Sequence, residues 1–372
     1  MLIFLWFLVM TAVLLLAQKM IYQRFALRKV SYSRRFSRNT CFRGEEMTLI
    51  EQLANRKWLP VPWVSAESQL SAHLRFRTGD NFAVSSGSHY QNHKSFFSLK
   101  PQSKITRTHW ITPQRRGWYR LHTVSLTSGD LLDIGRSVKQ LPLSSELIVY
   151  PRPADVDMGQ LPQHSWQGDV TVRRFIVPDP FVIAGARPYQ AGDSYKMVNW
   201  KATARAGSLQ VHQYDYTADR RLLVYLNVDD GEGMWRSVSD VELIEYGIEW
   251  AAGAVNCAIA AGMEAGFSTN MPLEGETNSV TIEPSGGHEQ LYMILEAMAK
   301  LRLERTEPFP MLLRRGAEEG YRDRDILIIS SYWNDELEAE AQRLRLSGNA
   351  VAIWELRMKE GSSDKEREGQ SA

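Results

Sequence analysis

Cysteine is nearly absent from this sequence, which has only Cys41 and Cys257 among its 372 residues. Two thiols so far apart form neither a disulfide framework nor the CxxC pairs that bind zinc. An excess of charge is missing too, because 44 lysines and arginines stand against 43 aspartates and glutamates. A chain with a net charge of +1 is unlike a protein whose whole surface holds nucleic acid. Secreted disulfide scaffolds, cysteine zinc sites and dedicated nucleic-acid binders therefore have no support.

The motifs of several enzyme classes are missing as well. No GxxxxGKS/T phosphate loop or HExxH zinc motif occurs, and no predicted strand runs into GxGxxG. His89 and His93 are four residues apart, but the polar stretch 79–95 predicts a surface loop in which both are solvated. Ser330 and Ser331 follow a predicted strand without a GxSxG elbow, which favours a strand cap over a nucleophile. The sequence thus indicates no nucleotide, zinc or serine-hydrolase site.

A long apolar run begins the sequence. Residues 1–17 have Thr11 as their only polar side chain and would form a helix of about 26 Å, nearly the thickness of a bilayer core. Eight basic residues precede the next acid, Glu45: Lys19, Arg24, Arg28, Lys29, Arg34, Arg35, Arg38 and Arg43. Since lysine and arginine are retained in the cytosol, we expect an anchor over 1–22 with the rest of the chain in the cytosol.

A cleaved signal peptide is the alternative for the same run. Its charged first region is missing and LLLAQKM is a poor cleavage site, so the anchor is favoured. The basic segment 23–39 either fixes the topology alone or also lies against anionic headgroups. The expected location is the inner (cytoplasmic) membrane, crossed once.

Two folded regions are predicted beyond the basic segment. Short alternating runs such as Met47–Leu53 predict an antiparallel β-sandwich, whereas later strands such as Leu222–Val228 alternate with amphipathic helices and predict a doubly wound α/β domain. The fold class is therefore α/β plus all-β. The expected segments are the anchor (1–22), a basic juxtamembrane segment (23–39), a β-sandwich-like domain (40–153), a connector (154–207), the α/β domain (208–358) and a disordered tail (359–372).

Three acids lie in the turn after the first buried α/β strand. Ligands gather at the carboxyl ends of strands in open α/β sheets, and Asp229, Asp230 and Glu232 lie there. Mg²⁺ prefers such oxygen ligands, so a metal-dependent hydrolase is one hypothesis. The other interpretation is an ordinary exposed turn, in which acidic residues and glycines are common.

Cationic and aromatic residues alternate in RRGWYR, from Arg115 to Arg120. Such a stretch could hold a nucleic-acid strand by stacking and phosphate contacts. The alternative is a tight turn that enters an amphipathic strand. The neutral net charge and the membrane anchor favour the turn, so no nucleic-acid partner is expected.

Residues 192–205, GDSYKMVNWKATAR, combine a turn with a predicted short helix. Asp193 or Ser194 is expected to cap this helix, which runs through Arg205. Trp200 and Arg205 are residue types that dominate interface hot spots, so the segment is a candidate docking epitope. Alternatively, Trp200 fills the junction between the two domains, and the sequence leaves both possibilities open.

The same segment resembles the signature of the bacterial family called domain of unknown function 58. There a Gly-Asp turn leads to an (Asp/Asn)-Trp-x-x-(Ser/Ala)-Ala-Arg helix and then to the first strand of a von Willebrand factor type A-like domain. The matching residues are Gly192, Asp193, Asn199, Trp200, Ala204 and Arg205. RRGWYRLHTVSLTSGDLLDIG also resembles the family's Arg-Gly-x-Tyr strand, so the likeness spans residues 32–354.

The resemblance implies a membrane-anchored protein with an immunoglobulin-like segment, working as an interaction scaffold or chaperone-like partner of a MoxR-type AAA ATPase in membrane or envelope assembly. It implies no enzymatic activity, cofactor or small-molecule substrate. The metal site of type A domains reads Asp-x-Ser-x-Ser, and here Asp229 is followed by Gly231 and Gly233 at the serine positions. Glycine has no side-chain oxygen, so this metal site is degenerate. The expected partner-binding residues are Gly192, Asp193, Asn199, Trp200, Lys201 and Arg205.

Overall fold

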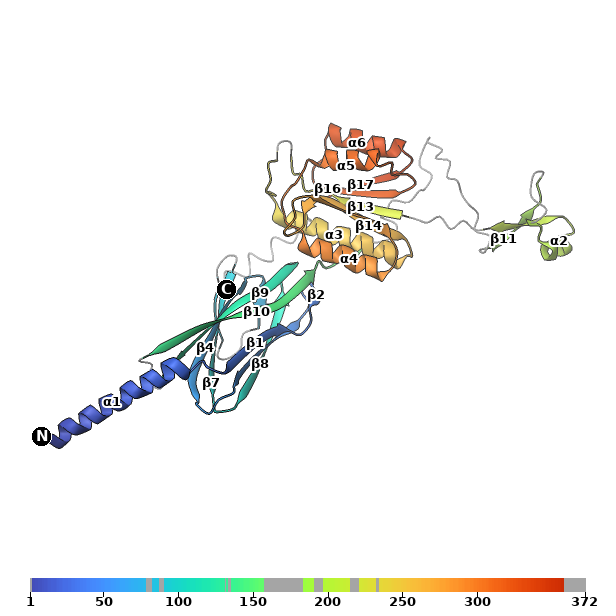
Figure 1. The fold of residues 1–372 in the computed structure, drawn as a ribbon. Coiled ribbons are helices and arrows are strands. Elements are labelled where there is room, and N and C mark those ends of the chain that lie inside the picture. Colours follow the sequence, from blue (N-terminus) through green and yellow to red (C-terminus); the bar gives the residue numbers. More distant parts are fainter. Residues whose placement is uncertain are drawn as a thin grey trace, which may run out of the picture. The chain divides into compact units, whose positions relative to one another are not determined.

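The protein has a mixed α/β architecture with many strands, seen in a computed structural model (Figure 1). The structure describes residues 2–77, 82–86, 90–130, 132, 135–156, 183–190, 197–214, 221–231 and 234–357. The chain divides into two compact units. The first unit comprises 1–154, 273–276 and 292–302, and the second comprises 155–272, 277–291 and 303–372.

Helix α1 (Leu2–Phe25) confirms the expected apolar helix and extends three residues beyond its predicted end. Its stretch Ile3–Phe25 has a mean hydropathy of 2.0 and is long and apolar enough to cross a membrane. The carboxyl end is fixed to the first unit, because the Ser137 hydroxyl donates to the Gln23 carbonyl at 2.7 Å. Lys29, at a φ of 56°, then turns the chain directly into the first strand.

Two sheets make up most of the first unit. The four-stranded sheet has the order β1 (Val30–Phe36), β3 (Met47–Asn55), β8 (Lys104–Pro113) and β5 (Leu74–Phe76), all antiparallel. The six-stranded sheet has the order β2 (Thr40–Phe42), β10 (Arg136–Tyr150), β9 (Gly117–Gly129), β4 (Val61–Ser71), β7 (Tyr90–Leu99) and β6 (Phe82–Ser86). Strand β1 occupies part of the segment predicted as juxtamembrane, so the sheets begin earlier than residue 40.

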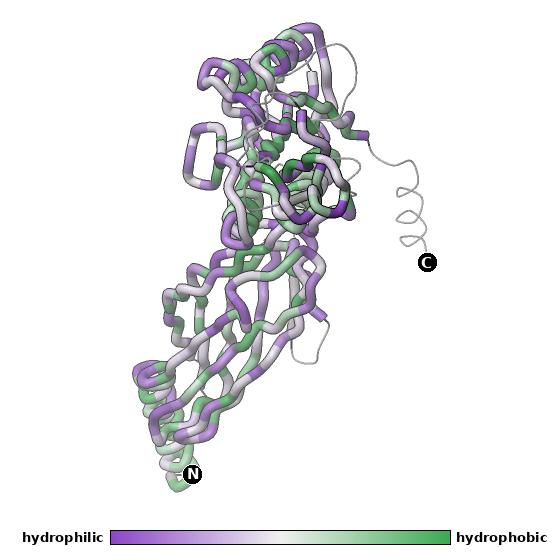
Figure 2. The backbone as a smooth tube through the Cα atoms, turned by 90° about the vertical axis from the view of Figure 1, so that its right-hand side faces the viewer, coloured by the Kyte–Doolittle hydropathy of each residue, from purple (hydrophilic) through white to green (hydrophobic). Residues whose placement is uncertain are grey.

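The two sheets form a sandwich, because every second side chain along their strands is buried between them. Along β3 every second side chain is buried, and Figure 2 shows hydrophilic and hydrophobic segments alternating along the strands of this unit. Leu53 of the four-stranded sheet packs in one core with Val64 and Leu126 of the six-stranded sheet. The alternation of polar and apolar residues in the sequence therefore corresponds to side chains that point alternately to solvent and into the core.

The prediction of a surface loop over 79–95 is wrong where β6 and β7 lie. Strand β7 turns polar residues inward: the buried Gln91 amide donates to the Ser71 and Leu74 carbonyls at 2.9 and 2.7 Å. His93, expected to be solvated, is 1% exposed and its ring centroid lies 4.1 Å from that of Phe76. The polar sequence of this segment resembles a loop, because the groups that bond its side chains lie far away in the sequence and leave no local signal. His89 lies outside the described residues.

A five-stranded sheet forms the centre of the second unit. Its order is β15 (Ser279–Ser285), β14 (Glu264–Pro272), β13 (Arg221–Leu226), β16 (Asp325–Ser330) and β17 (Ala350–Glu355). The last four strands are mutually parallel, as expected for an α/β domain. Strand β15 is instead antiparallel to β14, because the short connection between them allows a hairpin and not a crossover.

Helices cover both faces of this sheet. Helix α3 (Val241–Ala260) lies on one face, and α5 (Phe309–Glu318) and α6 (Asp335–Leu346) lie on the other (Figure 1). Asp240 caps α3 by accepting from the Leu243 N–H at 3.0 Å. Helix α4 spans His288–Lys300.

A small hairpin and a short helix precede the five-stranded sheet in sequence. Strand β11 (Ile183–Pro188) pairs antiparallel with β12 (Gln210–Tyr214), and α2 (Trp200–Ala206) lies between them in sequence. The helix begins at Trp200 and not at 193 or 194, because Asn199 caps it. The predicted connector therefore contains regular structure of its own, and the predicted tail lies outside the described residues.

Candidate functional site

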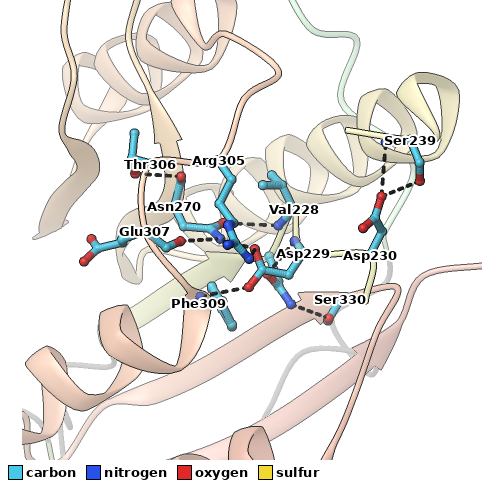
Figure 3. Close-up of polar contacts among 11 residues, drawn as sticks. Val228, Asp229, Asp230, Ser239, Asn270, Arg305, Thr306, Glu307, Phe309 and Ser330 are labelled. Carbon is cyan, nitrogen blue, oxygen red and sulfur yellow. Dashed lines mark hydrogen bonds and ion pairs between the residues drawn. The ribbon is translucent and has the colours of Figure 1, made fainter. Parts of the chain in front are cut away.

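Polar side chains from three parallel strands meet at one edge of the five-stranded sheet (Figure 3). Asn227 and Asp229 follow β13, Asn270 belongs to the end of β14, and Ser330 ends β16. The edge is the carboxyl end of the strands, where open α/β sheets bind their ligands. The polar turn at Asp229 therefore lies at the edge of the sheet where the sequence predicts it.

Asp229 is the centre of this arrangement. Its Oδ1 accepts from Asn270 Nδ2 at 2.8 Å, and its Oδ2 accepts from the Phe309 backbone N–H at 2.9 Å. Phe309 is the first residue of α5, and Pro308 before it provides no side-chain cap. The carboxylate of Asp229 therefore caps a helix that begins 80 residues later, where the helix dipole favours a negative charge.

Arg305 supplies a positive charge beside Asp229. Its Nη1 lies 3.8 Å from Asp229 Oδ1, and the two side chains are 18% and 8% exposed. Burial is the main influence on the pKa of Asp229 and raises it, while the Phe309 N–H, Arg305 and Asn270 lower it; the balance is a raised pKa. The Asp229 carboxylate thus accepts hydrogen bonds from Asn270 and Phe309 and has little contact with solvent.

Two asparagines hold the backbone around Asp229. The Asp229 N–H donates to Asn227 Oδ1 at 2.8 Å, and Asn270 Oδ1 accepts from the Val228 N–H at 3.1 Å. Asn227 Nδ2 in turn donates to Ser330 Oγ at 2.9 Å. The Ser330 hydroxyl donates to the Tyr332 carbonyl, so Ser330 closes a strand end and does not face a base.

These residues do not fit a Mg²⁺ site. Both Asp229 oxygens face N–H donors, and Asp230 points away toward Ser239, accepting from its N–H at 3.1 Å and from its hydroxyl (Figure 3). Gly231 has no side-chain oxygen, and Glu232 and Gly233 lie outside the described residues. Among the described residues no three His, Cys, Asp or Glu side chains are grouped to hold a metal. In the described part of the turn, Asp229 caps helix α5 and Asp230 accepts from Ser239.

A tryptophan follows this turn at the surface. Trp235 is 89% exposed, next to Met234, which is 8% exposed. The segment is tied to the loop before α5, since the Arg305 N–H donates to the Arg236 carbonyl at 2.8 Å. Sequence reasoning missed Trp235, Asn270 and Arg305. Asn270 alone has a local signal, because it is a polar residue at the end of a strand.

The motif residues that the structure describes lie on or beside α2. Asn199 Oδ1 accepts from the Ala202 N–H at 3.0 Å, and Asn199 Nδ2 lies 3.3 Å from His212 Nδ1. No residue of α2 is buried, and Trp200 is 69% exposed. The cap predicted at Asp193 or Ser194 is therefore Asn199. Lys201 and Arg205 are exposed on the same helix; Gly192 and Asp193 lie outside the described residues.

The RRGWYR stretch makes contacts within the first unit. Arg116 is 8% exposed, and its Nη1 donates to the Met298 and Leu301 carbonyls at 2.6 and 3.1 Å. Arg120 forms an ion pair with Glu274. Because both arginines bind other groups of the protein, their contacts favour the interpretation of RRGWYR as a turn that enters β9 over a nucleic-acid site.

Comparison with known families and proteins agrees with part of the resemblance. Residues 185–310 match the family model described as "Protein of unknown function DUF58", a range that includes both α2 and Asp229. The uncharacterized protein YeaD of Bacillus subtilis (strain 168) is 20% identical over 203 residues, which are 55% of this chain and 49% of that protein. The chain thus spans about half the length of this curated relative.

Two solved structures match the chain remotely. A non-cellulosomal cohesin from the archaeon Archaeoglobus fulgidus matches 32% of this chain and 91% of its own, at 7% identity and a TM-score of 0.22. The ASH/PapD-like domain of human CEP192 matches 32% of this chain and 86% of its own, at 16% identity and a TM-score of 0.20. At such TM-scores neither protein says anything about the function of this chain.

Proposed function

We propose that this chain is a membrane-anchored interaction scaffold or chaperone-like partner that works with a MoxR-type AAA ATPase in membrane or envelope assembly. In this proposal the first unit is immunoglobulin-like and the second is von Willebrand factor type A-like. Helix α1 is then a single-pass anchor of the inner (cytoplasmic) membrane, with the body of the protein in the cytosol. The family match over residues 185–310 and the apolar length of α1 support the proposal.

The observation that carries the proposal is the exposure of α2. This helix buries none of its side chains, yet it presents the 69% exposed Trp200 together with Lys201 and Arg205. Tryptophan and arginine are the residues that contribute most to protein interfaces, and an indole gains free energy when a partner buries it. A fixed N-cap at Asn199 holds the first turn of the helix in place, so the indole is presented on a formed turn.

The charge on α2 indicates the chemistry of the partner. The helix has no acid in its first turn and has Arg205 in its last turn. We therefore expect the partner surface to combine an apolar pocket for the Trp200 indole with carboxylates for Lys201 and Arg205. Such a surface on the ATPase would bind more weakly as salt rises, because exposed ion pairs are screened.

The direct test measures binding of the purified MoxR-type ATPase to the full chain in nanodiscs. Trp200→Ala is expected to weaken this binding about 30-fold or more, the effect of losing a hot-spot tryptophan. Trp58→Ala is the matched control, because Trp58 is an equally large and 79% exposed side chain of the first unit. Equal affinity of the wild type and Trp200→Ala, or no binding by the wild type, would contradict the proposal.

Two further measurements test the remaining parts. A reporter fused to the carboxyl end should be active only in the cytosol, and activity of a periplasm-only reporter would overturn the orientation. For the hydrolase alternative, calorimetry with Mg²⁺ or Mn²⁺ should detect no tight binding. Tight binding that is abolished by Asp229→Ala would favour the enzyme instead.

A further inference from the structure

A basic groove lies where α1 meets the first unit. It has a volume of about 460 Å³ and is lined by Ile21, Phe25, Arg28, Lys29, Lys57 and Leu59. The residues fall into two groups, three apolar side chains and three cations, and no acid of the described part of the chain is among them. This composition matches a ligand with a negatively charged head and a hydrocarbon body.

The cations are held at the end of the membrane-length helix. Lys57 Nζ donates to the Ala26 carbonyl at 2.5 Å, which ties the turn between β3 and β4 to the chain just after α1. Lys29 lies in the tight turn at a φ of 56°, and the Arg28 guanidinium lies 5.8 Å from the centre of the Phe25 ring. The positive charges are therefore positioned by backbone geometry and by contacts with the helix end.

The apolar side of the groove belongs to the apolar helix itself. Ile21 and Phe25 are the last exposed apolar residues of the stretch Ile3–Phe25 that can cross a membrane. Trp58, next to Lys57 in sequence, is 79% exposed, and tryptophan is enriched at the level of lipid headgroups. Apolar side chains of α1 are thus followed by cations, which is the order needed to contact the acyl chain and then the phosphate of a phospholipid.

We propose that this groove binds the headgroup of one anionic phospholipid, with the phosphate among Arg28, Lys29 and Lys57 and the upper acyl chain along Ile21 and Phe25. The lipid would fix the angle between α1 and the sandwich, because it touches the helix end and the β3–β4 turn at once. The site lies in the first unit and does not depend on the proposed ATPase partner.

The test uses the full chain in a non-ionic detergent, titrated with phosphatidylglycerol and with phosphatidylcholine, with native mass spectrometry counting the bound lipid. One phosphatidylglycerol per chain should be retained in preference to phosphatidylcholine. The double variant R28Q/K29Q should bind phosphatidylglycerol about 30-fold more weakly, since each basic residue near an anionic headgroup contributes about a fivefold factor. Leu59→Trp, which fills the groove and keeps all three cations, should also lose the lipid.

Arg24→Gln is the matched control, because it removes one charge close to the groove from a residue that does not line it. It should leave lipid binding unchanged. The proposal is overturned if Arg24→Gln weakens binding about fivefold, the factor expected for any one charge under diffuse attraction, or if Leu59→Trp retains the lipid. It is also overturned if inorganic phosphate displaces the lipid at equal concentration, because the groove would then be a free phosphate site.

Discussion

Asp229 and Phe309 are joined by a hydrogen bond of 2.9 Å that links the end of strand β13 to the start of helix α5. The carboxylate that a metal-binding turn would offer to a cation is used here to cap a helix. Asn270 and Arg305 complete its surroundings. Among the described residues, Asp229 thus joins the end of β13 to the start of α5, and Trp235 lies exposed in the segment beside it.

Asp229→Ala should destabilise the second unit by about 2–4 kcal/mol, because it removes the cap of α5 and leaves the buried Asn270 amide without its carboxylate acceptor. Hydrogen exchange should accelerate first at the start of α5. Asp230→Ala is the control: Asp230 is exposed and accepts from the N–H and the hydroxyl of Ser239, so the loss should stay below about 1 kcal/mol. Equal losses in the two variants would refute the capping role.

His93 should make the sandwich sensitive to acid. Burial, followed by the charge of Arg34, lowers its pKa to about 3 from 6.5. Between these values the unfolded chain binds the proton and the folded chain does not, so stability is lost as pH falls through this window, by about 2 kcal/mol at pH 5. Thermal unfolding at pH 7 and pH 5 measures this loss. His93→Gln should reduce the difference and exposed His122→Gln should not; an unchanged difference in His93→Gln would contradict the assignment.

Glu51 should be essential to the buried polar cluster of the sandwich. Its carboxylate accepts from the Tyr32 hydroxyl at 2.5 Å and lies 3.2 Å from His109 Nε2. Burial raises the pKa of Glu51, but His109, Arg34 and Tyr32 outweigh it and the pKa is lowered. Glu51→Leu leaves the buried Arg34 uncompensated and should cost about 3–5 kcal/mol in unfolding experiments. Tyr32→Phe removes one hydrogen bond and should cost clearly less; the reverse order would exclude this interpretation.

Asn199 should control the local stability of α2. Asn199→Ala removes the acceptor for the Ala202 N–H and should destabilise the helix by about 1 kcal/mol. Asn199→Asp keeps this acceptor and loses only the amide contact with His212, so it should remain close to the wild type. Hydrogen exchange of residues 197–207 distinguishes the two variants. If both exchange at the rate of the wild type, the cap does not hold this helix.

Elements with a strong local pattern could be predicted from the sequence alone. The apolar helix α1 and the buried strand β13 were expected at nearly their observed positions, because continuous apolar side chains leave few other structures. The first half of strand β7 escaped prediction because its inward side chains, Gln91, His93 and Ser95, are polar.

The sequence by itself determined the apolar helix, the alternation of the sandwich strands and the parallel strands of the second unit, since these follow from side-chain periods of 3.6 and 2 along a few residues. Only the tertiary structure decided the partners of polar groups. Asp229 meets Phe309 and Arg305, and His93 meets Phe76, because folding brings together residues that are far apart in the chain. A carboxylate at a strand end is equally suited to a cation and to a helix N-terminus, and the choice depends on which of them the fold places within 3 Å.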